Sequence, residues 1–218
     1  TWNLPEGFEA GEIQFPAPER IEMAGLMSFA YEDVVTFIVP IRAPENLELG
    51  QTVTIGVELF YLICKDVCLP GDASLSIDLS VAEAPKLSED APLFEAARAS
   101  QPSKDLPFLV SMTGVRDGKM SVGISLDPNQ PSAELPQNLY FYAEEEGLID
   151  ANAPQPYSFN DGFAELELAL DFAYRVDDQP PVAGVLQSST GSWKVSLGGV
   201  VEESDLGALV GAQTGASP

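Results

Sequence analysis

The stretch TVTIGVELFYLICKDVCLPGDASLSIDLSV, residues 52–81, alternates apolar with polar or small side chains on both sides of two cysteines. Alternation with a period of two is typical of β-strands. It predicts one strand over Thr52–Ile63 and a second over Ser74–Val81. The second is the clearest in the chain, because its apolar residues all fall on one face of the predicted strand.

The same pattern recurs along the chain and indicates an all-β protein. Further strands are predicted over Val34–Ile41, Pro107–Met112, Lys119–Leu126, Leu139–Glu144, Phe163–Leu170 and Ser192–Val200. Asp-Gly pairs at 117–118 and 161–162 are typical of tight hairpin turns. Short strands separated by turns at intervals of roughly 8–12 residues favour β-sandwiches.

The alternation stops between residues 82 and 105. A short helix is expected here over Ala91–Ala99, with Asp90 as its cap. Its helical spacing would bury Leu93, Phe94 and Ala97. We expect this segment to connect two β domains.

The charge excludes several classes of partner. The 218 residues contain 10 Lys and Arg against 34 Asp and Glu, for a net charge of −24. Such a chain repels phosphates, so nucleic acid and anionic membrane surfaces are not expected partners. No apolar run reaches the roughly 18–20 residues that a membrane-spanning helix needs. The start at Thr rather than Met leads us to expect a soluble region of a larger exported protein.

Cys64 and Cys68 are the only cysteines. Pro70 and Gly71 are expected to end regular pairing, which would leave the cysteines in an exposed tip or tight connection. Two thiols four positions apart can reach the ~5.5 Å Cα separation of a disulfide. A partner thiolate could then attack one sulfur of the small ring. These features favour a redox pair.

Two other interpretations remain open. A permanent bridge closing this five-residue loop would stabilise the fold by about 2 kcal/mol in the chain-entropy model. The reduced pair could instead bind Cu(I), with Met23 and Met27 as further sulfur ligands. The chain has no histidine to complete a zinc site, and we expect no resident metal or cofactor.

Three stretches resemble one family. They are WNLPEGFEAGEIQFPAPER (residues 2–20), the tyrosine in FAYEDVV (29–35) and FYLICKDVCLPGDASLSIDL (60–79). The opening Leu-Pro-x-Gly and Pro-x-Pro motifs and the Cys-Lys-Asp-x-Cys-x-Pro-Gly motif are together fairly specific. They resemble the periplasmic N-terminal region of DsbD-like protein-disulfide reductases, in the ScsB (suppressor of copper sensitivity) branch.

The strand pattern predicts two tandem β-sandwich domains, and the resemblance implies that they are immunoglobulin-like. The expected boundaries are 1–84 for the redox-active domain, 85–106 for the connection with its helix, 107–203 for the second domain and 204–218 for a flexible tail. This sequence departs from the best-known DsbD branch, which has a wider cysteine spacing and a single immunoglobulin-like domain.

The resemblance also implies a function. Cys64 and Cys68 would be the catalytic pair of a protein-disulfide reductase, in a periplasmic region of an inner-membrane protein. Its partners would be a thioredoxin-like or transmembrane domain of the same full-length protein and a periplasmic thioredoxin-fold substrate. A non-catalytic β-sandwich binding module with a permanent bridge is the alternative.

Five residues are candidates for shielding the pair or docking a partner. They are Tyr31, Phe60, Tyr61, Lys65 and Asp66. A tyrosine at an ordinary turn is an equal interpretation for Tyr31, and Tyr61 is expected to pack on its strand. Lys65 would favour a thiolate, whereas Asp66 would oppose it.

Overall fold

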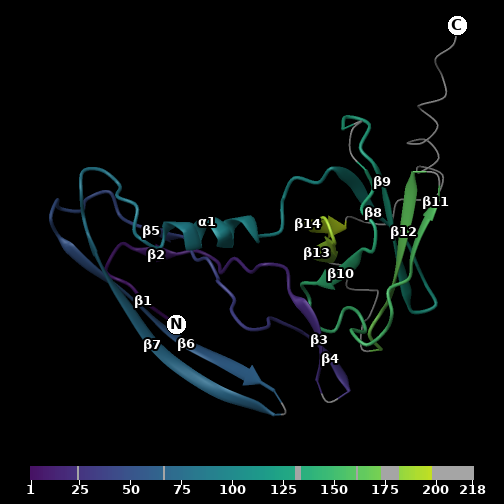
Figure 1. Ribbon diagram of the computed structural model, residues 1–218, viewed down its shortest axis with the longest axis horizontal. Coiled ribbons are helices and arrows are strands. Elements are labelled where there is room, and N and C mark those ends of the chain that lie inside the picture. The colour runs from purple at the N-terminus through teal and green to yellow at the C-terminus, as the bar shows by residue number, and fades with distance from the viewer. Residues whose placement is uncertain (24, 66, 131–133, 161, 173–181, 198–218) are drawn as a thin grey trace, which may run out of the picture. The chain divides into compact units, whose positions relative to one another are not determined.

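The computed structural model describes residues 1–23, 25–65, 67–130, 134–160, 162–172 and 182–197 (Figure 1). The chain divides into two compact units, Thr1–Gln101 and Pro102–Pro218. Both consist of antiparallel strands, and the described residues contain the single helix α1 (Ala91–Ala99). The prediction of an all-β, immunoglobulin-like fold with one short helix is therefore confirmed.

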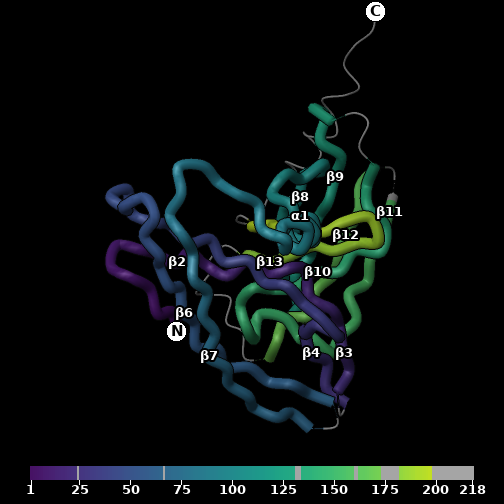
Figure 2. Tube along the Cα trace, turned by 60° about the vertical axis from the view of Figure 1, so that its left-hand side comes forward, coloured from purple at the N-terminus to yellow at the C-terminus, as the bar shows by residue number. Residues whose placement is uncertain are grey.

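The first unit contains three small sheets with the strand orders β1-β6-β7, β2-β5 and β3-β4. The strands are β1 (Trp2–Asn3), β2 (Glu9–Ala10), β3 (Glu19–Met23), β4 (Leu26–Ala30), β5 (Ile41–Arg42), β6 (Thr52–Cys64) and β7 (Cys68–Ser80). Figure 2 shows β6 and β7 as one long paired ribbon, and each strand has 13 residues.

The second unit is a sandwich of two sheets, β11-β12-β9-β8 and β10-β13-β14. Its strands are β8 (Phe108–Arg116), β9 (Lys119–Leu126), β10 (Tyr140–Ala143), β11 (Tyr157–Asn160), β12 (Phe163–Ala169), β13 (Val182–Ser188) and β14 (Gly191–Leu197). Side chains that point inward alternate with side chains that point outward. In β12, for example, Ala164, Leu166 and Leu168 are fully buried. Phe141 and Leu186 from the other sheet belong to the same core cluster.

The hairpin turn at Asp117-Gly118 is present as predicted. Arg116 pairs with Lys119, and both turn residues have positive φ angles, 52° and 74°. Two successive left-handed residues are the signature of a type I′ turn, whose twist matches that of the flanking strands. The second predicted turn includes Asp161, which lies outside the described residues, as do residues 204–218 of the predicted tail.

Three local predictions are wrong. Val34–Pro40 forms no strand, apart from a single bridge between Ile38 and Gln14, and of the predicted range only Ile41 belongs to a strand, β5. Asp90 stands at the N-cap position directly before α1, but its side chain makes no capping hydrogen bond. Of the three residues expected to be buried by α1, only Ala97 is, whereas Leu93 and Phe94 are about half exposed. The helix belongs to the first unit, so the structure divides the chain after it.

The buried core of the described residues lies almost wholly in the second unit. The first unit contributes Val53, Ile55 and Ala97 to the buried apolar residues. Val53 and Ile55 belong to the N-terminal half of β6, and the distal half of the β6–β7 ribbon exposes its apolar side chains. The distal half is where the two cysteines lie.

Candidate functional site

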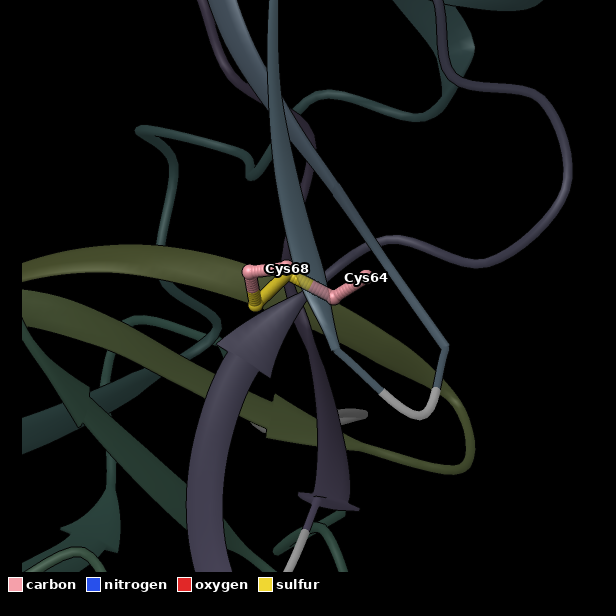
Figure 3. The surroundings of a disulfide bond; sticks show 2 residues. All are labelled: Cys64 and Cys68. Carbon is pink, nitrogen blue, oxygen red and sulfur yellow. A yellow bond between two sulfur atoms is a disulfide. The ribbon is translucent and has the colours of Figure 1, made fainter.

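Cys64 and Cys68 form a disulfide at the tip of the β6–β7 ribbon (Figure 3). They are the last cross-strand pair of the hairpin, with Cα atoms 4.0 Å apart. Only residues 65–67 connect the strands, and the Lys65 N–H donates to the Val67 carbonyl at 3.3 Å. The tip is therefore closed both by its short loop and by the sulfur–sulfur bond.

Strand pairing continues through Pro70 and Gly71, against expectation. Leu62 pairs with Pro70 and Tyr61 with Gly71. Hydrogen-bonded and non-hydrogen-bonded pairs alternate in an antiparallel ladder. Because the hydrogen bond across the loop makes the pair 65–67 a bonded one, the pair 62–70 is not bonded. Pro70 therefore removes no hydrogen bond from the ladder, and the ribbon tolerates it on its edge strand.

The alternation of side chains places the disulfide on one face of the ribbon. Counting back from Cys64, this disulfide face carries Leu62 and Phe60, and on β7 it carries Pro70 and Asp72 opposite them. Nearer the base the same face is polar, as in the hydrogen bond of 2.6 Å between the Thr54 hydroxyl and the Asp78 carboxylate.

The opposite face of the ribbon is apolar along its whole length. From base to tip, its residues on β6 are Val53, Ile55, Val57, Leu59, Tyr61 and Ile63, and on β7 they are Leu79, Ile77, Leu75, Ala73, Gly71 and Leu69. The predicted residue Phe60 thus shares a face with the disulfide, whereas Tyr61 points away from it.

The disulfide is accessible. Cys68 is exposed and Cys64 is half-buried. On the disulfide face, Phe60 is 76% exposed and Leu62 is 60% exposed. Exposed aromatic and aliphatic side chains beside a reactive bond form an apolar surface that a protein partner can cover.

Tyr31 lies in an aromatic cluster of the first unit. Its hydroxyl donates to the Pro16 carbonyl at 2.8 Å, and its ring packs edge-on against Phe37 at 5.5 Å. Phe37 in turn packs against Phe15 at 5.1 Å. Burial raises the pKa of the Tyr31 hydroxyl above the usual tyrosine value. These contacts hold Tyr31 in place through neighbours other than the cysteines, and its shielding role stays a prediction.

Another segment approaches the tip. Figures 1 and 2 both show the β3–β4 hairpin beside the end of the β6–β7 ribbon. Tyr31 follows β4 directly in the sequence. Met23 and Met27, the two methionines considered as sulfur ligands, are half-buried residues of this hairpin.

The charged candidates lie in the loop. Lys65 is exposed at the tip, and Asp66 falls outside the described residues. Within the parts of the chain that the structure describes, no group of three or more His, Cys, Asp or Glu side chains is arranged to hold a metal ion. The helix found in the same residues is too short and too polar to cross a membrane.

Tyr61 packs across the ribbon onto Gly71. A Cβ atom added to Gly71 would lie 2.5 Å from Cε2 and 2.7 Å from Cζ of the Tyr61 ring. The sequence predicts that Tyr61 packs on the strand but does not indicate where. Gly71, Leu62 and Pro70 were missed as members of the site, although counting in twos from Cys64 would have found the last two.

The fold and the hairpin disulfide define an immunoglobulin-like β protein with a two-cysteine site at an exposed strand end. Residues 1–79 match the family described as the N-terminal region of thiol:disulfide interchange protein DsbD. These residues, which include both cysteines, are similar to that N-terminal region, and the resemblance seen in the sequence is confirmed.

The chain is similar in fold to the crystal structure of the N-terminal periplasmic domain of ScsB from Proteus mirabilis. The TM-score is 0.63 at 16% sequence identity, and the match covers 90% of this chain and 83% of that one. No curated protein sequence matches significantly.

Proposed function

We propose that this chain is a periplasmic thiol–disulfide exchange module of a larger disulfide reductase, with Cys64 and Cys68 as its redox pair. The observation that carries the proposal is the location of the bond, which joins the last residue pair of an exposed hairpin. The DsbD-type match over residues 1–79 and the ScsB-like fold support the same class of activity.

A purely structural role is a weaker explanation of this bond. The strands it joins are already connected by a three-residue loop. In the chain-entropy model, closing so short a loop contributes about 2 kcal/mol, less than half of what a bridge across ~100 residues contributes. A bond at the exposed tip is instead well placed for attack by a partner thiolate.

The difference in exposure between the two cysteines supports a separate role for each. Cys68 is exposed and Cys64 half-buried. In the reduced module, the Cys68 thiolate attacks one sulfur of a substrate disulfide, forms a mixed disulfide and releases the other substrate sulfur as a thiolate. The Cys64 thiolate then attacks the Cys68 sulfur, closes the bond and releases the second substrate thiolate, and the released thiolates take up protons.

Two electrons pass from the module to the substrate in this cycle. A dithiol protein upstream, in the same full-length chain, reduces the Cys64–Cys68 bond again. The substrate is a thioredoxin-fold protein in its disulfide form. Phe60, Leu62 and Pro70 on the disulfide face supply the apolar surface that the substrate covers as it docks.

Trapping the mixed disulfide tests this proposal. Cys64→Ala removes the resolving thiol. The reduced variant, mixed with an oxidised thioredoxin-fold protein, should therefore accumulate a covalent adduct that dithiothreitol cleaves by reduction. Cys68→Ala should give much less adduct, and the double variant none. Non-reducing electrophoresis with mass spectrometry measures all three. The absence of adduct from both single variants would contradict a role in exchange, and a stronger adduct from Cys68→Ala would reverse the two roles.

A further inference from the structure

The Tyr61 ring and Gly71 form a contact that the exchange chemistry itself does not require. They are cross-strand partners three residue pairs below the disulfide. Tyr61 is on the face away from the sulfurs, and its ring lies so close to Gly71 that a Cβ there would meet Cε2, Cζ and Oη at 2.5, 2.7 and 3.0 Å.

Backbone conformation does not explain this glycine. Gly71 lies within β7, and its φ is outside the left-handed region that favours glycine. A glycine inside a strand weakens it, unless a neighbouring aromatic ring covers the exposed backbone. Gly71 is half-buried between two exposed neighbours, Pro70 and Asp72, as expected if the Tyr61 ring covers it.

Within the β6–β7 hairpin itself, few other side-chain contacts hold the tip when the disulfide opens. Its apolar side chains beyond Tyr61 are exposed, including Leu62, Ile63 and Leu69. A two-stranded ribbon without a covering layer is only marginally stable in water. Reduction removes the sulfur–sulfur bond, which leaves the backbone ladder and cross-strand packing to keep Cys64 opposite Cys68.

We propose that Tyr61, packed on Gly71, is a positioning residue that keeps the two thiols in register after the disulfide opens. The inference rests on the proposed redox role of the pair. Because the ring is on the opposite face, it can hold the strands together without covering the sulfurs. It acts on the redox pair through the hairpin and touches neither substrate nor sulfur.

The equilibrium with glutathione reports this role. Two glutathione molecules reduce one protein disulfide and yield one protein dithiol and one glutathione disulfide. A hairpin held in register keeps the two thiols at a high effective concentration, which favours ring closure. Without the Tyr61–Gly71 contact the dithiol is less constrained, so the disulfide becomes easier to reduce.

The experiment compares five variants of the full chain at fixed ratios of reduced to oxidised glutathione. Tyr61→Ala and Gly71→Ala should each shift the equilibrium toward the dithiol by about fivefold, or roughly 20 mV toward a less negative potential. Tyr61→Phe keeps the ring and should match the wild type. Leu59→Ala is the matched control, because Leu59 is on the same face, is 40% exposed against 41% for Tyr61, and faces Ala73 instead of a glycine.

The double variant makes the test specific. Once the ring is absent, a methyl group at position 71 displaces nothing, so Tyr61→Ala with Gly71→Ala should shift no further than Tyr61→Ala alone. Additive shifts, shifts within about 1.5-fold of the wild type, or an equal shift in Leu59→Ala would each overturn the inference. The fraction of disulfide is read by alkylation and mass spectrometry, and thermal unfolding of each oxidised variant checks that it folds.

Failure of this inference is distinguishable from failure of the proposed function. The glutathione equilibrium involves no protein partner, whereas the trapping experiment depends on one. Non-additive shifts of the glutathione equilibrium without any trapped adduct would support the positioning role and contradict the exchange function. Trapped adducts without such shifts would support the exchange function and contradict the positioning role.

Discussion

At the residue scale, burial changes the ionisation of Tyr31. Its hydroxyl is hydrogen-bonded to the Pro16 carbonyl, and burial raises its pKa above the usual tyrosine value. The neutral hydroxyl is thus favoured in the folded state. The resulting stabilisation is complete below the usual tyrosine pKa of ~10 and is lost as the pH rises through the higher folded pKa.

A spectrophotometric pH titration checks this expectation. The near-ultraviolet difference between the wild type and Tyr31→Phe should show a tyrosine that ionises above the usual value. Tyr157 donates to the Pro136 carbonyl in the second unit, and burial also raises its pKa. Tyr157→Phe is therefore the control and should leave the ionisation of Tyr31 unchanged. A midpoint at or below the ordinary tyrosine value would show that the hydroxyl is freely hydrated.

At the scale of elements, the turns fix which residues face each other. The hairpin β8–β9 depends on Gly118, whose φ of 74° is left-handed. Gly118→Ala should destabilise the second unit by about 1 kcal/mol, because a Cβ atom is strained in that region. The measurement is urea unfolding followed by circular dichroism.

Gly114 provides the control for Gly118. It lies in the same hairpin, at an irregularity of β8, with no positive φ and no atom within 4 Å of an added Cβ. Gly114→Ala should therefore change the stability much less than Gly118→Ala. Equal losses of stability in the two variants would mean that the left-handed conformation of Gly118 does not cause the destabilisation.

At the scale of the whole molecule, the two units differ in how they are stabilised. The second has a closed core between two sheets, with Val122, Ile124 and Leu166 fully buried. The first depends on a long ribbon with a disulfide at its tip. Because the bond and the large core belong to different units, the redox state should affect only one of them.

Hydrogen exchange on the full chain tests this independence. Reduction of the disulfide should speed amide exchange in the distal half of β6 and β7, because the bond there constrains the opened hairpin. Exchange in β9 and β12 of the second unit should stay unchanged. Loss of protection in these core strands on reduction would show that the units unfold together.

The sequence predicted the strands best where alternation is strong. β6, β9 and β12 agree with their predicted ranges to within one residue at each end. The pattern failed at Val34–Ile41, where the apolar run meets residues 10–14 only at separate points, the pair Ala10–Ile41 of β2 and β5 and the bridge Gln14–Ile38. Short strands such as β3 and β4 were missed, since their five residues carry little periodic signal.

For the site, the sequence predicts that two nearby cysteines follow a long strand and which side chains share their face, because side chains alternate with a fixed period of two. The register across the hairpin becomes known from the folded structure. Register places Pro70 at a pair that needs no hydrogen bond and Gly71 beneath the Tyr61 ring. In a hairpin the turn and its length set the register, and the alternation of side chains alone does not specify where the turn lies.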